Sequence, residues 1–101
     1  MTIASITEVS DNAYLLKGVI NHESSVSVLA EGMALFTQAS GPSITVDLRF
    51  LENPNTVCAA LLVVWKSNLM KQNKTIIFTA TPEALHSVMK MSNINQMMDI
   101  E

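Results

Sequence analysis

The first twenty residues contain two short runs of strand-forming residues. Residues 3–9 alternate weakly between apolar and polar positions, and residues 13–19 are richer in residues that favour strands. Asp11 and Asn12 lie between the two runs and are typical turn residues. The pattern therefore predicts a β-hairpin at the start of the chain.

The pattern then changes to a helical period over residues 26–37. Ser24 or Ser25 is placed to cap the start of this helix. Gly32 lowers its stability by about 1 kcal/mol relative to Ala, and we expect it to allow close packing on the sheet. The turn sequence Ser40-Gly41-Pro42 ends the helix. One face of this helix carries apolar residues at helical spacing, namely Val26, Leu29, Met33 and Phe36.

The central part of the chain reads as a strand, a loop and a second helix. Residues 43–48 form the best strand candidate, and their weak alternation predicts burial on both faces. Residues 49–55 are expected to form a loop, and the second helix runs from Thr56 to about residue 71. Thr56 either caps this helix with its hydroxyl or lies in its first turn.

The chain is predicted to end with a short strand and a third helix. Residues 75–79 form the strand, and Pro82 occupies the first helical position after it. The helix is expected to break at residues 92–95, with a final turn at residues 96–98. Its inner face carries Leu85, Val88 and Met89.

The order of elements is therefore β-β-α-β-α-β-α. Strands joined by helices of this length pair in parallel through right-handed crossovers. The sequence predicts one α/β domain over residues 1–101, with a small mixed sheet of about four strands covered by three to four helices.

Composition points to a protein-binding surface. Apolar residues make up 49% of the 101 residues and charged residues only 15%, against about 25% in a typical domain. We infer that part of the surface is apolar and contacts a partner. A surface of Ser, Thr, Asn and Gln is the alternative. The net charge is −3 and the basic residues are scattered, which argues against a nucleic-acid ligand.

A cytoplasmic location is expected from the cysteine content and the hydrophobic runs. The chain has a single cysteine and no signal-peptide pattern at its start. Its longest apolar run, residues 57–65, is far shorter than the roughly 20 residues needed to span a bilayer.

The chain lacks the side-chain combinations that an enzyme or a metal site needs. His22, expected in a loop, and His86, expected in a helix, have no metal ligands at suitable spacing. Cys58 lies in an apolar helix, where burial would raise its pKa and make it inert. The carboxylates of Asp47 and Glu52 provide no base next to Thr56, and no glycine-rich phosphate loop exists. We therefore expect no catalysis, metal or cofactor.

The second helix is apolar nearly all round, which predicts burial on two sides. One stripe, expected to face the sheet, contains Val57, Ala60, Leu61 and Val64. A second set lies to the side and contains Cys58, Leu62, Trp65 and Leu69. Another helix of the domain or a partner protein covers this second side. Trp65 is the candidate partner contact, because Trp is enriched at interface hot spots.

These features resemble the STAS domain family, to which the anti-sigma-factor antagonists belong. The element order, the sequence Val46-Asp47-Leu48 before a loop, and the segment from Asn55 to Ala59 are similar to the family pattern. In that pattern an Asp-Ser/Thr-x-Gly-Leu motif opens the second helix. The turn at residues 71–76 and the closing helix from Pro82 are also similar, so the resemblance covers residues 15–98.

Within this family, the short chain resembles the STAS subunits of Mla-type phospholipid-transport ABC systems. The similarity lies in residues 16–20, the following helix and Ala60-Leu61-Leu62. It implies a cytoplasmic, non-catalytic protein that reaches the inner membrane of Gram-negative bacteria by binding the transporter's ATPase subunit, which it stabilises or activates. The residues expected at that interface are Asn53, Asn55, Thr56, Val57, Ala59, Leu62 and Trp65.

Two departures from the family motif leave alternatives open. Asn55 replaces the motif aspartate and Cys58 replaces the motif glycine. The resemblance marks Thr56 as a candidate phosphorylation site. A phosphate suits a helix N-terminus, whereas its charge of about −2 would oppose an apolar contact. The alternative functions are an anti-sigma-factor antagonist switched at Thr56, and a module that binds lipid or nucleotide near the same helix start.

Overall fold

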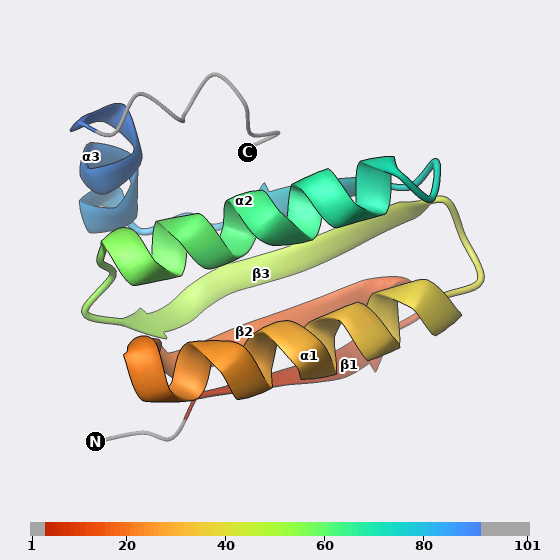
Figure 1. Ribbon diagram of the computed structural model, residues 1–101, viewed down its shortest axis with the longest axis horizontal. Coiled ribbons are helices and arrows are strands. Elements are labelled where there is room, and N and C mark those ends of the chain that lie inside the picture. The colour runs from red at the N-terminus through yellow and green to blue at the C-terminus, as the bar shows by residue number, and fades with distance from the viewer. Residues whose placement is uncertain (1–3, 92–101) are drawn as a thin grey trace.

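The computed structural model describes residues 4–91 of the chain. Within that range the predicted order of elements, β-β-α-β-α-β-α, is confirmed (Figure 1). The strands and helices are β1 (Ser5–Ser10), β2 (Ala13–Val19), α1 (His22–Gln38), β3 (Ser43–Glu52), α2 (Thr56–Met70), β4 (Thr75–Thr79) and α3 (Glu83–Met91).

The four described strands form one mixed sheet in the order β1-β2-β3-β4. β1 and β2 are antiparallel and joined by the predicted hairpin turn, where Asn12 adopts a left-handed conformation with a φ of 61°. β2–β3 and β3–β4 are parallel pairs, linked through α1 and α2 respectively. Asn12 also holds the start of β3, because its carbonyl oxygen accepts a hydrogen bond of 2.9 Å from the amide of Thr45.

The helices α1 and α2 lie side by side across one face of the sheet, and α3 stands beside the beginning of α2 (Figure 1). On β3, Ile44, Val46 and Leu48 are buried beneath these helices. Thr45 and Asp47, between them, are only half-buried. The prediction that this strand is covered on both faces is therefore wrong within the described residues, because α1 and α2 share one face.

An aromatic cluster joins the two helices to the sheet. The Phe36 ring lies edge-on to both Tyr14 and Trp65, with ring centroids 5.1 Å apart in each pair. The indole nitrogen of Trp65 donates a hydrogen bond of 3.1 Å to the carbonyl oxygen of Leu29. Gly32 makes room for this ring, since a Cβ there would lie 2.6 Å from Trp65 Cε2. The close packing expected at Gly32 is thus against α2, not against the sheet.

α1 begins four residues earlier than the sequence pattern predicted. Asn21 caps it by accepting hydrogen bonds of 2.9 Å from the amides of Glu23 and Ser24. The Ser24 hydroxyl accepts from the Asn21 amide in return, which completes a capping box. His22 is therefore in the helix. Residues 28, 32 and 36 form the buried face, and Val26 is 71% exposed.

β3 is longer than predicted, because residues 49–52 continue the strand. A bulge between β2 and β3 inserts one extra residue into β3, so Leu15 pairs with Asp47 but Lys17 pairs with Phe50. The Asp47 carboxylate accepts a hydrogen bond of 2.8 Å from the Arg49 amide at this bulge. Arg49 and Phe50 are consecutively exposed, and this break in the alternation made the segment look like a loop.

The remaining predicted elements lie close to their expected positions. β4 occupies the predicted range, and α2 ends at Met70. In α3, Leu85 and Met89 are buried and Val88 is half-buried, as predicted. The expected break and final turn over residues 92–98 lie outside the described residues. No helix within residues 4–91 is long and apolar enough to cross a membrane.

Candidate functional site

The N-termini of α1 and α2 meet at one end of the molecule. β2 and β3 both end there, and each leads directly into its helix (Figure 1). Side chains from two separate parts of the sequence are therefore brought together at the carboxyl ends of two adjacent parallel strands. This is the edge at which open α/β folds place their functional groups.

Asn55 caps α2 and connects it to the rest of this end. Its Oδ1 atom accepts a hydrogen bond of 3.0 Å from the Cys58 amide. Its Nδ2 atom donates to the carbonyl oxygens of Ile20, at 3.0 Å, and Asn53, at 3.3 Å. The loop bends at Asn53, which has a left-handed φ of 48°. Asn55, one of the predicted site residues, is thus half-buried and connects the start of α2 to Ile20 and to the preceding loop.

Thr56 is the first residue of α2, so the second of its two predicted positions is correct. Its cap is Asn55, and Thr56 itself is exposed. The N-terminus of α2 has a partial positive charge, which favours an anionic group near this hydroxyl. The structure therefore leaves Thr56 accessible both to a protein partner and to a modifying enzyme.

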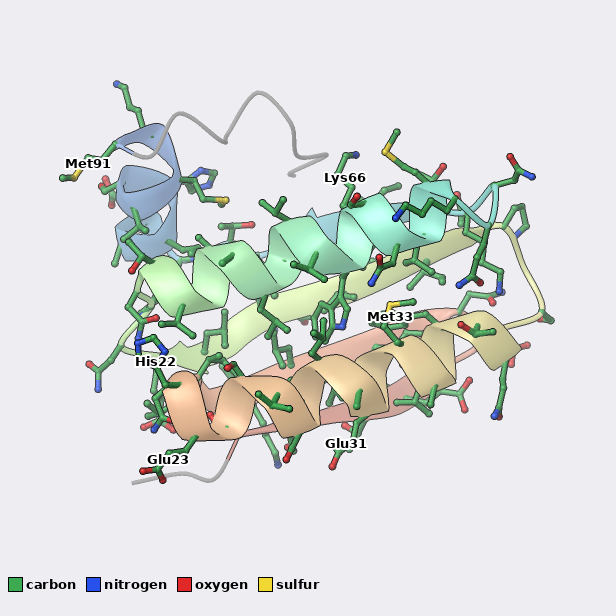
Figure 2. The ribbon with its side chains drawn as sticks, in the orientation of Figure 1. His22, Glu23, Glu31, Met33, Lys66 and Met91 are labelled. Carbon is green, nitrogen blue, oxygen red and sulfur yellow. The ribbon has the colours of Figure 1, made fainter. Side chains whose placement is uncertain are left out.

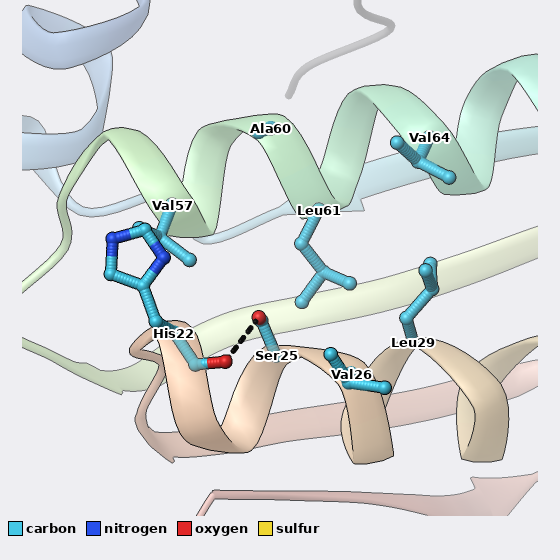
Figure 3. Close-up of a pocket in the computed structure, with 8 residues that line it drawn as sticks. All are labelled: His22, Ser25, Val26, Leu29, Val57, Ala60, Leu61 and Val64. Carbon is cyan, nitrogen blue, oxygen red and sulfur yellow. Dashed lines mark hydrogen bonds between the residues drawn. The ribbon is translucent and has the colours of Figure 1, made fainter.

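An apolar groove of about 290 Å³ runs between α1 and α2 from this end of the molecule. His22 lies beside Val57 at its start, and Leu29 and Leu61 point into the space between the helices (Figure 3). The Ser25 hydroxyl donates a hydrogen bond of 3.3 Å to the His22 carbonyl oxygen. The lining residues are His22, Ser25, Val26, Leu29, Val57, Ala60, Leu61 and Val64. Val26 and Val64 are exposed, at 71% and 38%, so apolar surface is open to solvent here.

The buried face of α2 differs from the prediction, although Leu61 of the predicted stripe is buried too, at 4% exposure. Cys58, Leu62, Trp65 and Leu69 are each 0% exposed and form the core face. Within the stripe predicted to face the sheet, Ala60 and Val64 are exposed and Val57 is half-buried. Apolar residues surround nearly the whole helix, so the sequence pattern does not distinguish its two sides.

Three residues predicted to contact a partner lie in the core instead. Trp65 and Leu62 are 0% exposed, and Ala59 is 1% exposed. The prediction that they form an interface is wrong, because α1 and the sheet already cover them. Of the two covers that the sequence allowed for this side of α2, a helix of the domain or a partner, the structure shows the first, because α1 packs on Trp65.

The candidate chemical groups are not assembled into a reactive centre within the described residues. Burial raises the pKa of the Cys58 thiol to about 12, which confirms the expected direction. His22 lines the groove, whereas His86 lies on the exposed side of α3. No group of three His, Cys, Asp or Glu side chains in residues 4–91 could hold a metal ion.

Sequence reasoning missed the contribution of α1 to the groove. His22 was expected in a loop, and Val26 and Leu29 were expected to face the core. The missed signal is Asn21, a strong N-cap residue that precedes Ser24 by three positions. A helix starting after Asn21 would have placed His22, Val26 and Leu29 on one stripe.

Comparison with known proteins supports the resemblance noted in the sequence. A family model described as "Mlab, STAS domain" matches residues 10–99. Among curated proteins, none matches the sequence significantly.

Solved structures share the fold at low sequence identity. A chain of the Acinetobacter MlaFEDB complex in its ATP-bound Vtrans2 conformation is 22% identical, with a TM-score of 0.79, over 88% of this chain and 93% of that one. A chain of the same complex in its ATP-bound Vtrans1 conformation is 20% identical, with a TM-score of 0.74, and the match covers 91% of this chain and 96% of that one. The unphosphorylated anti-sigma factor antagonist SpoIIAA is 13% identical, with a TM-score of 0.72, and the match covers 97% of this chain and 87% of that one. At these identities the structures show the fold, and the family model covers most of the sequence. The chain therefore belongs to the STAS domain family.

Proposed function

We propose that this protein is a non-catalytic STAS subunit that binds the ATPase of an Mla-type ABC transporter and stabilises or activates it in phospholipid trafficking. The observation that carries the proposal is the apolar groove between α1 and α2, which opens beside the exposed Thr56. The likeness to a chain of the MlaFEDB complex supports an ATP-driven transporter as its setting.

The docking surface that we propose consists of the groove and the loop that leads into α2. Asn53 is exposed on that loop, Thr56 is exposed at the first position of α2, and Val57 joins them to the groove. Val26 and Val64 provide exposed apolar area on the two sides. An apolar patch bordered by polar residues is typical of a protein-binding surface. The proposed site therefore keeps the predicted loop and moves the apolar contact from Trp65 to the groove.

Affinity measurements with charged groove variants test this proposal. Val26→Asp and Val64→Asp each place a carboxylate on the groove. Burying an unpaired charge in an interface is costly, so we expect at least about tenfold weaker binding to the purified Mla-type ATPase subunit of the same organism. Val9→Asp is the matched control, because Val9 is 59% exposed and lies on β1, away from the groove. Equal affinity of all four proteins would contradict the proposal.

The second candidate function is an anti-sigma-factor antagonist switched by phosphorylation of Thr56. The exposed hydroxyl at the start of α2 and the likeness to SpoIIAA favour it. Co-purification distinguishes the two functions, since a transporter ATPase supports the first and a serine-kinase anti-sigma factor supports the second. Recovery of lipid with neither protein partner would contradict both.

A further inference from the structure

The two helix caps of this molecule use the same residue type in different ways. The hydrogen bonds described for the Asn21 side chain, at the start of α1, are both accepted by its oxygen. Asn55, at the start of α2, accepts one bond and donates two more from its amide nitrogen. Aspartate is as good a cap as asparagine. Capping alone therefore does not explain why either position has an amide side chain. The hydrogen bonds donated by the side-chain Nδ2 atom of Asn55 therefore require a separate explanation.

The hydrogen bond from Asn55 to Ile20 links the starts of the two helices. Ile20 is 1% exposed and immediately precedes Asn21, the cap of α1. The 3.0 Å contact between Asn55 Nδ2 and the Ile20 carbonyl oxygen thus ties the cap of α2 to the residue that leads into α1. His22 and Val57 lie just beyond these caps and form the start of the groove (Figure 3).

The same amide also holds the loop. Its contact with the Asn53 carbonyl oxygen, at 3.3 Å, spans a bend in which Asn53 is left-handed. A carboxylate at position 55 would lose both donated bonds and would place a negative charge opposite two carbonyl oxygens. An amide satisfies all three neighbours, because it offers an acceptor and two donors in one side chain.

We propose that Asn55 is a positioning residue for partner binding: its side-chain amide fixes the spacing of the α1 and α2 N-termini, and thereby the shape of the groove and the placement of Thr56. This inference rests on the proposed function, because the groove is the surface that it presets. A preset surface binds more tightly, since less ordering is needed when the complex forms.

Three variants separate positioning from capping. Asn55→Asp keeps the capping oxygen and removes the donor. Asn55→Ser also keeps a capping oxygen, without adding charge. Asn21→Asp is the matched control, because the hydrogen bonds described for that side chain are both accepted by its oxygen. We expect both Asn55 variants to bind the purified Mla-type ATPase subunit at least about tenfold more weakly than the wild type. We expect Asn21→Asp to bind like the wild type.

Methyl NMR of the free proteins tests the positioning without the ATPase. We expect the resonances of Val57 and Leu61 to shift or broaden in both Asn55 variants and to stay unchanged in Asn21→Asp. Thermal unfolding of each variant shows whether the domain remains folded. Unchanged methyl spectra in the folded Asn55 variants would overturn the inference, as would a loss of affinity confined to Asn55→Asp. If the wild-type protein fails to bind the ATPase, the proposed function is wrong, and the methyl spectra still decide the positioning role.

Discussion

Gly32 sets how closely α1 and α2 approach each other. A Cβ at this position would lie 2.6 Å from Cε2 and 2.8 Å from Nε1 of the Trp65 ring. The ring has little freedom to move, because it packs edge-on against Phe36 and donates a hydrogen bond to Leu29. Glycine is the residue that allows this contact, and its lower helix propensity is the accompanying cost.

We expect Gly32→Ala to lower the free energy of unfolding by about 1–2 kcal/mol. Overpacking of a dense core costs about 1–3 kcal/mol, and the better helix propensity of Ala offsets part of it. Urea denaturation measures the change. In the Trp65→Phe background, the smaller ring should make the Gly32→Ala substitution less destabilising. A Gly32→Ala protein more stable than the wild type would contradict the described packing.

Cys58 makes the stability of the domain sensitive to alkaline pH. Burial raises its pKa from an ordinary value near 9 to about 12 in the folded protein. Above about pH 9 the unfolded chain loses this proton while the folded chain keeps it. The free energy of unfolding should therefore fall between pH 9 and 12, with a contribution of at most about 1.4 kcal/mol per pH unit.

The pH dependence of Cys58→Ala provides the comparison. This variant removes the thiol and leaves every other ionisable side chain in place, so the slope of unfolding free energy against pH should be shallower than in the wild type. Urea titrations at pH 8, 9 and 10 measure both slopes. Parallel slopes for the two proteins would mean that the thiol is not protected by burial.

At the scale of elements, Lys74 holds the end of α1 in place. Lys74 immediately precedes β4 in the sequence. Its ammonium group donates hydrogen bonds to the carbonyl oxygens of Phe36 at 2.7 Å, Thr37 at 3.1 Å and Ala39 at 3.1 Å. The last carbonyl groups of a helix lack partners within the helix and carry partial negative charge. One lysine thus satisfies three acceptors and links two elements that are distant in sequence.

We expect Lys74→Met to lower the free energy of unfolding by about 1–2 kcal/mol, because hydrogen bonds to a charged group are stronger than neutral ones. Lys71→Met is the control, since Lys71 is exposed at the end of α2. Chemical denaturation compares the two variants. Equal stability of both would show that the contacts made by Lys74 contribute little.

The elements differ in how far the sequence predicts them. β2 and β4 have clear strand composition and were predicted at their observed bounds. β3 was shortened because its bulge exposes Arg49 and Phe50 in succession, which breaks the alternation. α1 was shortened because its capping box uses Asn21 with Ser24 in place of a more familiar pair.

At the scale of the whole molecule, the sequence predicts the fold better than the site. Element order follows from local patterns, so the STAS architecture and the start of α2 at Thr56 could be predicted. The groove depends on which face of α2 turns inward, and an all-round apolar helix leaves that choice to tertiary packing. Figure 2 shows the outcome: Met33 points into the seam between α1 and α2, and Glu31 and Lys66 point away from it.

The low content of charged residues led to the expectation of an apolar partner-binding surface at Trp65, but most of the apolar residues of α2 belong to the core. In the described part of the chain the large apolar side chains of α2 fill a core shared by two helices and one sheet face. Val26 and Val64 remain exposed and border the groove. The apolar surface proposed to meet a partner lies where α1 and α2 run side by side.

Photo-crosslinking tests most directly whether this groove is the docking surface for the transporter ATPase. A benzophenone amino acid replaces Val26 in one protein and Val9 in another, since both side chains are more than half exposed. Each protein is irradiated with the Mla-type ATPase subunit of the same organism, and the crosslinked products are identified by mass spectrometry. We predict a crosslink to the ATPase from position 26 and none from position 9. A crosslink from position 9 alone, or from neither position, would contradict the proposed docking surface.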